Sequence, residues 1–238
     1  MRGWWREIGG LVLPVACAGC GSPRTSLCGE CRRELYGAWP CRVRPSPEPP
    51  GLPPVCAAAP YEDAVRAVLL AHKERGALGL AQRLGRALAG AVDAVAPPGT
   101  GTGPLLLVPV PSTSRAVAAR GHDGVRRVAA AAAGELRRAG RAARVLPVLR
   151  QRRAVADQAG LAAHQRLANL AGALEVAGGG ARLLGAGRVV VVDDLVTTGA
   201  SLAEAARAVR AARDAEAGAP LAAAVVAASS VSFEINRN

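Results

Sequence analysis

The chain contains one stretch that decides its fold: Val189-Val190-Val191-Val192-Asp193-Asp194-Leu195-Val196-Thr197-Thr198-Gly199-Ala200-Ser201. Its four consecutive valines predict a strand buried in a parallel sheet, with two carboxylates where that strand ends. A short loop of small and hydroxyl-bearing residues follows, and residues 202–210 predict a helix. Backbone N–H groups of such a loop and helix N-terminus face an anion, and carboxylates accept hydrogen bonds from ribose hydroxyls. The stretch therefore predicts a place to hold a phosphorylated sugar.

The whole run resembles the 5-phosphoribosyl-1-pyrophosphate (PRPP) signature of type I phosphoribosyltransferases. The resemblance implies that Asp193 and Asp194 are the catalytic acids and bind the ribose hydroxyls. Ser201 is also a candidate helix cap, and a glycine in the loop permits positive φ and close backbone approach. The alternative is an ordinary α/β turn with a chance acidic pair. The resemblance also implies that the 5′-phosphate is wrapped by Val196, Thr197, Thr198, Gly199, Ala200 and Ser201.

The composition predicts a full core and a strong positive charge. The chain has 238 residues, of which 50% are hydrophobic and only 3% aromatic, so alanine and glycine supply much of the core. The net charge of +12 invites a nucleic-acid-binding interpretation. The basic residues are almost all arginines spread along the chain, which is the pattern expected from a GC-rich coding bias. A positive potential would also suit the binding of an anionic substrate. Lys73 is the only lysine.

The sequence predicts a cytoplasmic protein without a membrane partner. No segment reaches the roughly 18–20 apolar residues of a transmembrane helix. The first 17 residues loosely resemble a signal peptide with a lipoprotein cysteine, but their apolar part is short and interrupted by Gly9, Gly10 and Pro14.

Two C-x-x-C pairs, separated by seven residues, stand near the amino terminus. Each pair makes a tight turn, and two such turns complete a tetrahedral shell of four thiolates. Disulfides are the alternative, but paired C-x-x-C motifs in a cytosolic chain favour a metal. The pattern predicts a structural zinc held by Cys17, Cys20, Cys28 and Cys31.

Cys41 and Cys56 remain outside this cluster, and each lacks a C-x-x-C partner. They are either buried thiols or the remnant of a second ribbon. Between them, Pro45 to Pro54 is proline-rich and predicted to be extended or disordered. This stretch predicts a domain boundary, with a zinc-ribbon-like domain and linker in residues 1–58 and a second domain in residues 59–238.

The second domain alternates between strands and helices. Helices are predicted over residues 62–71, 78–95 and 125–139, and strands over residues 105–111 and 145–149. This alternation predicts an α/β fold, a parallel sheet with helices on both faces.

In this order, the landmarks of the chain resemble the ComF family, whose members carry an amino-terminal zinc ribbon followed by a type I phosphoribosyltransferase domain. The family includes proteins linked to DNA uptake in natural competence and others named for gluconate use. The resemblance covers nearly the whole chain. Besides the cysteines and the PRPP run, it rests on Lys73 with Arg75-Gly76, Val108 to Pro111, Arg120-Gly121, Gln158 to Leu161, and Arg166 with Asn169 and Gly172.

The resemblance implies further site residues at the carboxyl edge of the sheet, where α/β folds place ligands. Lys73, Arg75 and Arg115 would balance the charge of pyrophosphate, and Ser112 belongs to the loop that would hold it. The alternatives are a solvated helix end for Lys73 and Arg75, and a plain turn for residues 112–115. The segment from Gln158 to Asn169 either shapes the site or is the start of a helix with polar surface residues.

One departure from the family falls in a segment predicted to face the substrate. The family commonly reads Arg-Gly-Phe-Asn-Gln where this chain reads Arg120-Gly121-His122-Asp123-Gly124. His122 and Asp123 form either an acid–base pair or a hydrogen-bonded loop. A second departure is the single cysteine ribbon, where the family often has two.

The resemblance implies that the chain binds PRPP with Mg²⁺ and transfers phosphoribosyl to an unknown acceptor with release of pyrophosphate. One alternative is a non-enzymatic adaptor of DNA uptake whose zinc ribbon contacts single-stranded DNA or a competence helicase. Another is a zinc-ribbon DNA binder with an inert second domain.

Overall fold

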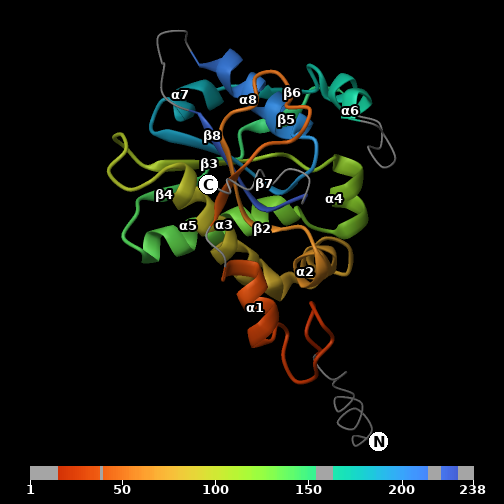
Figure 1. The fold of residues 1–238 in the computed structure, drawn as a ribbon. Coiled ribbons are helices and arrows are strands. Elements are labelled where there is room, and N and C mark those ends of the chain that lie inside the picture. The colour runs from red at the N-terminus through yellow and green to blue at the C-terminus, as the bar shows by residue number, and fades with distance from the viewer. Residues whose placement is uncertain (1–15, 38–39, 154–162, 214–220, 230–238) are drawn as a thin grey trace, which may run out of the picture.

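The computed structural model describes residues 16–37, 40–153, 163–213 and 221–229. Its centre is a six-stranded sheet with the order β1-β2-β8-β7-β3-β4 (Figure 1). Neighbouring strands run parallel except β1, which is antiparallel to β2. The predicted α/β fold with a mostly parallel sheet is confirmed. The strands are β1 (Cys41–Val43), β2 (Val55–Pro60), β3 (Leu105–Pro109), β4 (Ala143–Val145), β7 (Arg188–Val196) and β8 (Ala222–Ala228).

Helices cover both faces of this sheet (Figure 1). The larger ones on one side are α2 (Asp63–Glu74), α3 (Ala81–Val95) and α5 (Gly124–Arg138), and on the other α8 (Ala200–Ala212). The shorter elements are α1 (Gly29–Tyr36), η3 (Leu78–Leu80), α4 (Ser114–Arg120), β5 (Leu149–Gln151), α6 (Ala163–Leu170), β6 (Leu174–Val176) and α7 (Gly180–Leu184).

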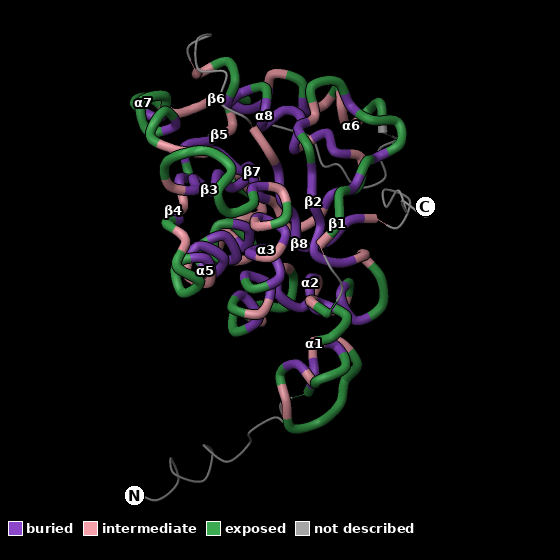
Figure 2. The backbone as a smooth tube through the Cα atoms, turned by 60° about the vertical axis from the view of Figure 1, so that its left-hand side comes forward, coloured by how far each residue is buried: buried purple, intermediate pink, exposed green. Residues whose placement is uncertain are grey.

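The core has two halves because successive strand residues point to opposite faces of the sheet. Leu107 and Val192 pack with α2, α3 and α5, whereas Val108 and Val191 pack with α8, α7 and the two-stranded β5–β6 sheet. Figure 2 shows the inner strands β2, β3 and β8 buried along nearly all of their length, whereas the edge strands β1 and β4 are partly exposed. A strand buried on both faces must be apolar at every position, which explains the unbroken valine run of β7.

The connections of β3 and β7 leave the carboxyl edge of the sheet on opposite faces. These strands are neighbours, but the helix that follows β3 towards β4 is α5, on one face, and the helix that follows β7 towards β8 is α8, on the other. Neighbouring strands whose connections leave on opposite faces form a topological switch point, where α/β folds bind ligands. Asp193 and Asp194 lie at this end of β7.

The amino-terminal cysteine segment packs on the main core. Cys31 and Leu35 of α1 are buried in the same cluster as Val65 and Val68 of α2. β1 pairs with β2 and so joins the main sheet, and β2 runs across the predicted boundary at residue 58. The division into domains 1–58 and 59–238 stays a prediction.

Several predicted elements have different bounds in the structure. The strand predicted over residues 145–149 is two elements, because β4 ends at Val145 and β5 begins at Leu149. Pro147 lies between them and has no N–H to donate to a ladder. β7 continues to Val196, so both acids lie inside the strand, and Asp193 pairs in register with Val225 of β8. α8 begins at Ala200, two residues earlier than predicted.

Among the described residues, the structure contains no helix of the length and apolarity that crossing a bilayer requires. The signal-peptide-like segment before Ala16 lies outside the described residues.

Candidate functional site

The two acids of β7 meet the only lysine of the chain at the carboxyl edge of the sheet. Lys73, in the last turn of α2, places Nζ 3.0 Å from Oδ2 of Asp194. The backbone N–H of Asp194 donates to Oδ1 of Asp193 over 2.8 Å. The side chain of Asp194 is 14% exposed and that of Lys73 is 39% exposed, so the pair opens to solvent on the lysine side.

The surroundings of Asp193 raise its proton affinity in a way that suits a ligand site. Burial raises the pKa of Asp193 well above its usual value, and the charge of Asp194 adds to this rise while Lys73 opposes it. Asp194 raises the pKa of Lys73, and the charge of Arg120 opposes that shift. Asp193 thus holds a proton more tightly than an ordinary aspartate, and strongly perturbed carboxyl groups in a crevice are typical of functional sites.

The loop after β7 has the backbone geometry that its sequence predicts. Gly199 has a φ of 75° and is the N-cap of α8, a conformation that glycine adopts without strain. Ser201, a candidate cap, lies instead in the first turn, because the helix begins at Ala200. Thr197 is exposed and Thr198 is half-buried. The loop brings hydroxyl groups and the N–H groups of a 13-residue helix to one place.

The helix α6 reaches this loop from another part of the chain. Nη1 of Arg166 donates to Oγ1 of Thr197 over 3.1 Å. Arg166 belongs to the segment that the family resemblance assigned to shaping the site, and this contact places it beside the loop. Gln158 to Leu161, at the start of that segment, lie outside the described residues.

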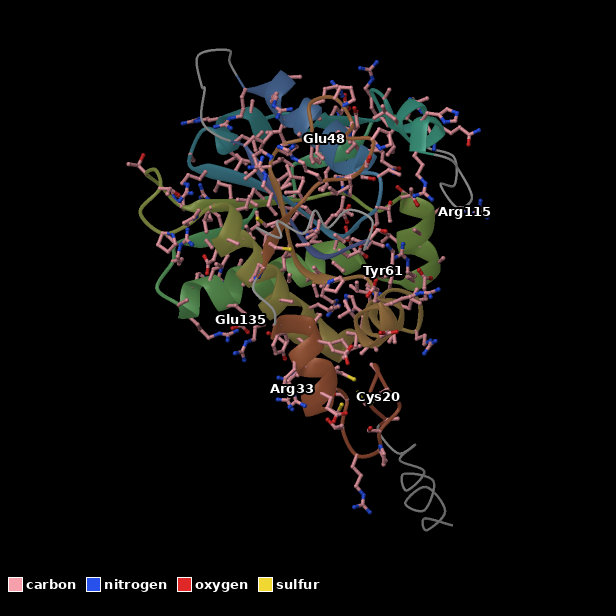
Figure 3. The ribbon with its side chains drawn as sticks, viewed as in Figure 1. Cys20, Arg33, Glu48, Tyr61, Arg115 and Glu135 are labelled. Carbon is pink, nitrogen blue, oxygen red and sulfur yellow. The ribbon has the colours of Figure 1, made fainter. Side chains whose placement is uncertain are left out.

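The proline-rich loop between β1 and β2 covers the other side of Gly199. A Cβ atom added to Gly199 would lie 3.1 Å from Cγ of Pro45, 3.2 Å from Cγ of Pro49 and 3.3 Å from Cδ1 of Leu52. The segment expected to be extended or disordered is therefore folded against the loop that follows β7. Figure 3 shows Glu48 of this segment above the sheet, near α8.

The loop after β3 holds its two predicted residues, Ser112 and Arg115, in different surroundings. Ser112 is half-buried, and its hydroxyl donates to Oδ1 of Asp123 over 3.5 Å. Arg115 lies in the first turn of α4, whose N-cap Thr113 accepts from the N–H of Ala116. Figure 3 shows Arg115 at the outer side of α4. Arg75 is the exposed C-cap of α2, and among the described residues neither arginine side chain pairs with an acid.

The contacts of His122 and Asp123 favour a hydrogen-bonded loop over an acid–base pair. Oδ1 of Asp123 accepts from the N–H of Arg126 over 3.1 Å and so caps α5. Nδ1 of His122 faces the carbonyl of Arg120 at 2.9 Å, so this nitrogen is turned to a backbone carbonyl. The His122 ring lies 5.9 Å from the ring of His72, which is 3% exposed. Burial lowers the pKa of His72.

The four clustered cysteines form the second site. Their Sγ atoms all lie within 4.8 Å of one another, and those of Cys20 and Cys28 are 3.6 Å apart. Four sulfurs around zinc at about 2.3 Å stand about 3.8 Å apart, so this donor set fits a structural metal such as zinc. Four thiolates leave no open position for catalysis. The cysteines form no disulfide, and Figure 3 shows Cys20 beside α1, far from Arg115.

The surroundings of the cluster stabilise the thiolates of Cys17 and Cys20, whereas burial and the neighbouring sulfurs raise the pKa of Cys31. Burial alone would raise the pKa of Cys17, but N–H groups of Cys28, Cys20 and Gly19 lower it to about 6. The N–H of Cys28 lies 3.3 Å from Sγ of Cys17. Thiolates are the form that binds metal, so the turns favour the liganding state.

Cys41 and Cys56 do not form a second cluster. Cys41 pairs in register with Ala57, which places Cys56, the next residue, on the opposite face of the β1–β2 ladder. Cys41 is exposed and Cys56 is buried. Only Cys56 fits the interpretation of a buried thiol.

Comparison with family models and with curated proteins gave no match. Two features of the carboxyl-edge site were not predicted from the sequence: the proline-rich cover on Gly199 and the His72–His122 contact. Both depend on segments that are distant in the sequence, so no local pattern signals them.

Proposed function

We propose that the chain binds PRPP as its Mg²⁺ complex at the carboxyl edge and transfers phosphoribosyl to an acceptor with release of pyrophosphate. This proposal rests on one observation. Asp193, Asp194 and Lys73 lie together at the switch point of the sheet, close to the N-terminus of α8, whose N-cap is a glycine. The resemblance to type I phosphoribosyltransferases, and to the ComF family in particular, supports the same function.

Each part of the site has a role in this reaction. The carboxyl groups of Asp193 and Asp194 accept hydrogen bonds from the ribose 2′- and 3′-hydroxyls. The loop from Val196 to Ser201 holds the 5′-phosphate with backbone N–H groups and hydroxyls. Lys73 exchanges its contact with Asp194 for one with pyrophosphate, to which it brings a point charge.

The chemical step needs positioning and charge stabilisation more than covalent chemistry. The bond from C1′ of the ribose to pyrophosphate breaks, and the electron pair leaves with pyrophosphate. A nucleophilic atom of the acceptor then forms the new bond to C1′. Magnesium, which arrives with PRPP and keeps several waters, neutralises part of the pyrophosphate charge.

The role of Lys73 in binding is tested by Lys73→Met. We expect this variant to bind PRPP with Mg²⁺ about tenfold or more weakly in isothermal titration, since an ion-paired contact to phosphate is lost. Arg66→Met is the matched control, because Arg66 is exposed on the same helix and lies near its other end. Equal affinity of Lys73→Met and wild type would remove Lys73 from the site.

Phosphoribosyl transfer is a separate claim from PRPP binding. The alternative function is that of a non-enzymatic adaptor of DNA uptake. The net charge of +12 and the cysteine cluster near the amino terminus favour a contact with single-stranded DNA or a helicase. Pyrophosphate release measured with PRPP over a panel of nucleobases decides between them. Release with one base supports transfer. PRPP binding without release, together with salt-dependent DNA binding that Cys20→Ser/Cys28→Ser abolishes, supports the adaptor.

A further inference from the structure

A pocket lies between the proline-rich loop, α6 and α8. Its volume is about 690 Å³, within the range of about 300–1,000 Å³ that is common for small-molecule sites. Its walls are mostly apolar and include Pro50, Leu167, Ala203 and Ala211. Asp193, Asp194 and Lys73 do not line it.

The polar groups of this pocket leave a net positive charge. Glu204 is 5% exposed, and both its oxygens are used: Arg207 donates through Nε and Nη2, and the N–H of Leu174 donates over 2.9 Å. The carboxylate and the guanidinium of this pair neutralise each other. Arg210 remains, with Nη1 donating to the carbonyl of Gly51 over 2.6 Å and no acid paired with it among the described residues.

The walls of the pocket belong to the same elements that touch the loop after β7. Leu167 lines the pocket, and its neighbour Arg166 bonds Thr197. Pro50 lines the pocket, and its neighbour Pro49 lies against Gly199. A ligand between α6 and the proline-rich loop would therefore contact both elements that flank this loop.

We propose that this pocket is a second ligand site, for a small amphipathic anion. The apolar body of the ligand lies on Leu167, Ala203 and Ala211, and its single carboxylate or sulfonate group faces Arg210 at the rim. Apolar walls with one or two placed polar groups are the common design of such sites. The proposal does not depend on PRPP binding, because the pocket and its charge are present without a ligand at the acids.

The probe for this site is 8-anilinonaphthalene-1-sulfonate, an apolar double ring with one anionic group. We expect saturable binding to the folded full-length chain, one probe per chain, seen as a rise in fluorescence. Decanoate should displace the probe, and the uncharged decanol should do so at least about fivefold less well, because it lacks the charge that faces Arg210.

Two variants locate the binding. Ala211→Trp places a large side chain in the pocket from an exposed position and should weaken probe binding about tenfold, and Arg210→Gln should weaken it about fivefold. Ala94→Trp on α3 and Arg182→Gln on α7 are the matched controls, at exposed positions outside the pocket. Circular dichroism confirms that each variant is folded.

Three results would overturn the proposal. The first is the absence of saturable binding by the wild type. The second is equal probe affinity for Ala211→Trp and Ala94→Trp, which would place the probe elsewhere on this basic protein. The third is equal displacement by decanol and decanoate, which would remove the anion from the ligand class. The titrations contain no PRPP, so their failure leaves the proposed function untouched.

Discussion

Asp193 is the residue at which stability and the proposed ligand binding have opposite requirements. Its pKa is raised by burial and by Asp194, so the folded state binds this proton more tightly than the unfolded chain does. Stability is therefore fully present below the unfolded pKa of about 3.9 and falls as pH rises through the folded pKa. The carboxyl group is retained at a cost in stability, which is expected of a group that serves a ligand.

Asp193→Asn tests this conflict. The amide keeps an oxygen that accepts from the N–H of Asp194 but cannot ionise. We expect the variant to be about 1 kcal/mol more stable than wild type at pH 7, because no buried charge forms. The two proteins should have similar stability near pH 3. Urea denaturation across this pH range measures the difference, and a variant less stable than wild type at pH 7 would contradict the assigned environment of Asp193.

Gly199 joins the loop after β7 to the proline-rich cover. Gly199→Ala should lower the free energy of unfolding by about 2 kcal/mol, since it combines the cost of a left-handed alanine with crowding against the prolines. Gly140→Ala is the control, because Gly140 has a φ of 78° and nothing within 4 Å of its added Cβ. Equal losses for the two variants in urea denaturation would mean that the cover does not restrain the loop.

For these residues, the sequence predicted local backbone and ligand chemistry, but it did not predict which distant residues they contact. The positive φ of Gly199 and the closeness of the four cysteines follow from local patterns, glycine in a tight loop and paired C-x-x-C turns. The contact of Lys73 with Asp194 joins residues 121 positions apart (194 − 73). Only the fold brings them together, so the residues alone gave no basis for that pairing.

The helices α3 and α5 pack closely against each other, and a glycine permits this approach. A Cβ added to Gly85 of α3 would lie 2.4 Å from Cβ of Ala131 and 2.8 Å from the backbone nitrogen of Ala132. Gly85→Ala should therefore destabilise the protein by about 1–3 kcal/mol, because the helices must separate. Gly134→Ala, whose added Cβ meets only the end of Arg138 at 3.9 Å, should stabilise α5 by about 0.5–1 kcal/mol.

Thermal unfolding of the two variants checks this packing directly. Both substitutions add the same methyl group to a helix, so helix propensity alone predicts the same sign for both. A lower unfolding midpoint for Gly85→Ala and a higher one for Gly134→Ala would confirm the close approach of α3 and α5. Stabilisation by Gly85→Ala would show that the helices are further apart.

The helix α2 connects the two sites of the molecule. A Cβ added to Gly19, in the first cysteine turn, would lie 3.0 Å from Cβ of Ala64 near the start of α2, and Lys73 stands in the last turn. Cys20→Ser/Cys28→Ser should lose bound zinc and lower the unfolding midpoint by roughly 3–8 °C, since α1 then packs less firmly on α2. Metal analysis and thermal unfolding measure both effects. An unchanged zinc content in the variant would rule out the four-cysteine site.

Whole elements were predictable where their pattern was long and uniform. The unbroken valine run of β7 and the helical periodicity of α3 and α5 are clear patterns, and the structure contains these elements. The short elements α4, α6, α7 and β6 have too few residues for a pattern. The strand predicted over residues 145–149 was wrong because apolar residues on both sides of Pro147 looked continuous.

The arrangement of the whole molecule depends on strand order, which periodicity does not contain. Alternating strands and helices predicted a parallel sheet, but not that β7 would lie between β3 and β8. That order creates the switch point and places Asp193 and Asp194 beside the loop after β3. It also places the proline-rich loop over Gly199, although the two are about 150 residues apart in the sequence.

The most direct test of the central claim is isothermal titration of the full-length chain with PRPP in the presence of Mg²⁺. We predict one binding site per chain for the wild type and a loss of affinity of about 100-fold or more for Asp193→Ala/Asp194→Ala, because both hydroxyl contacts disappear. Absence of binding by a folded wild-type chain, or equal affinity of the folded double variant, would contradict a PRPP site at the carboxyl edge of β7.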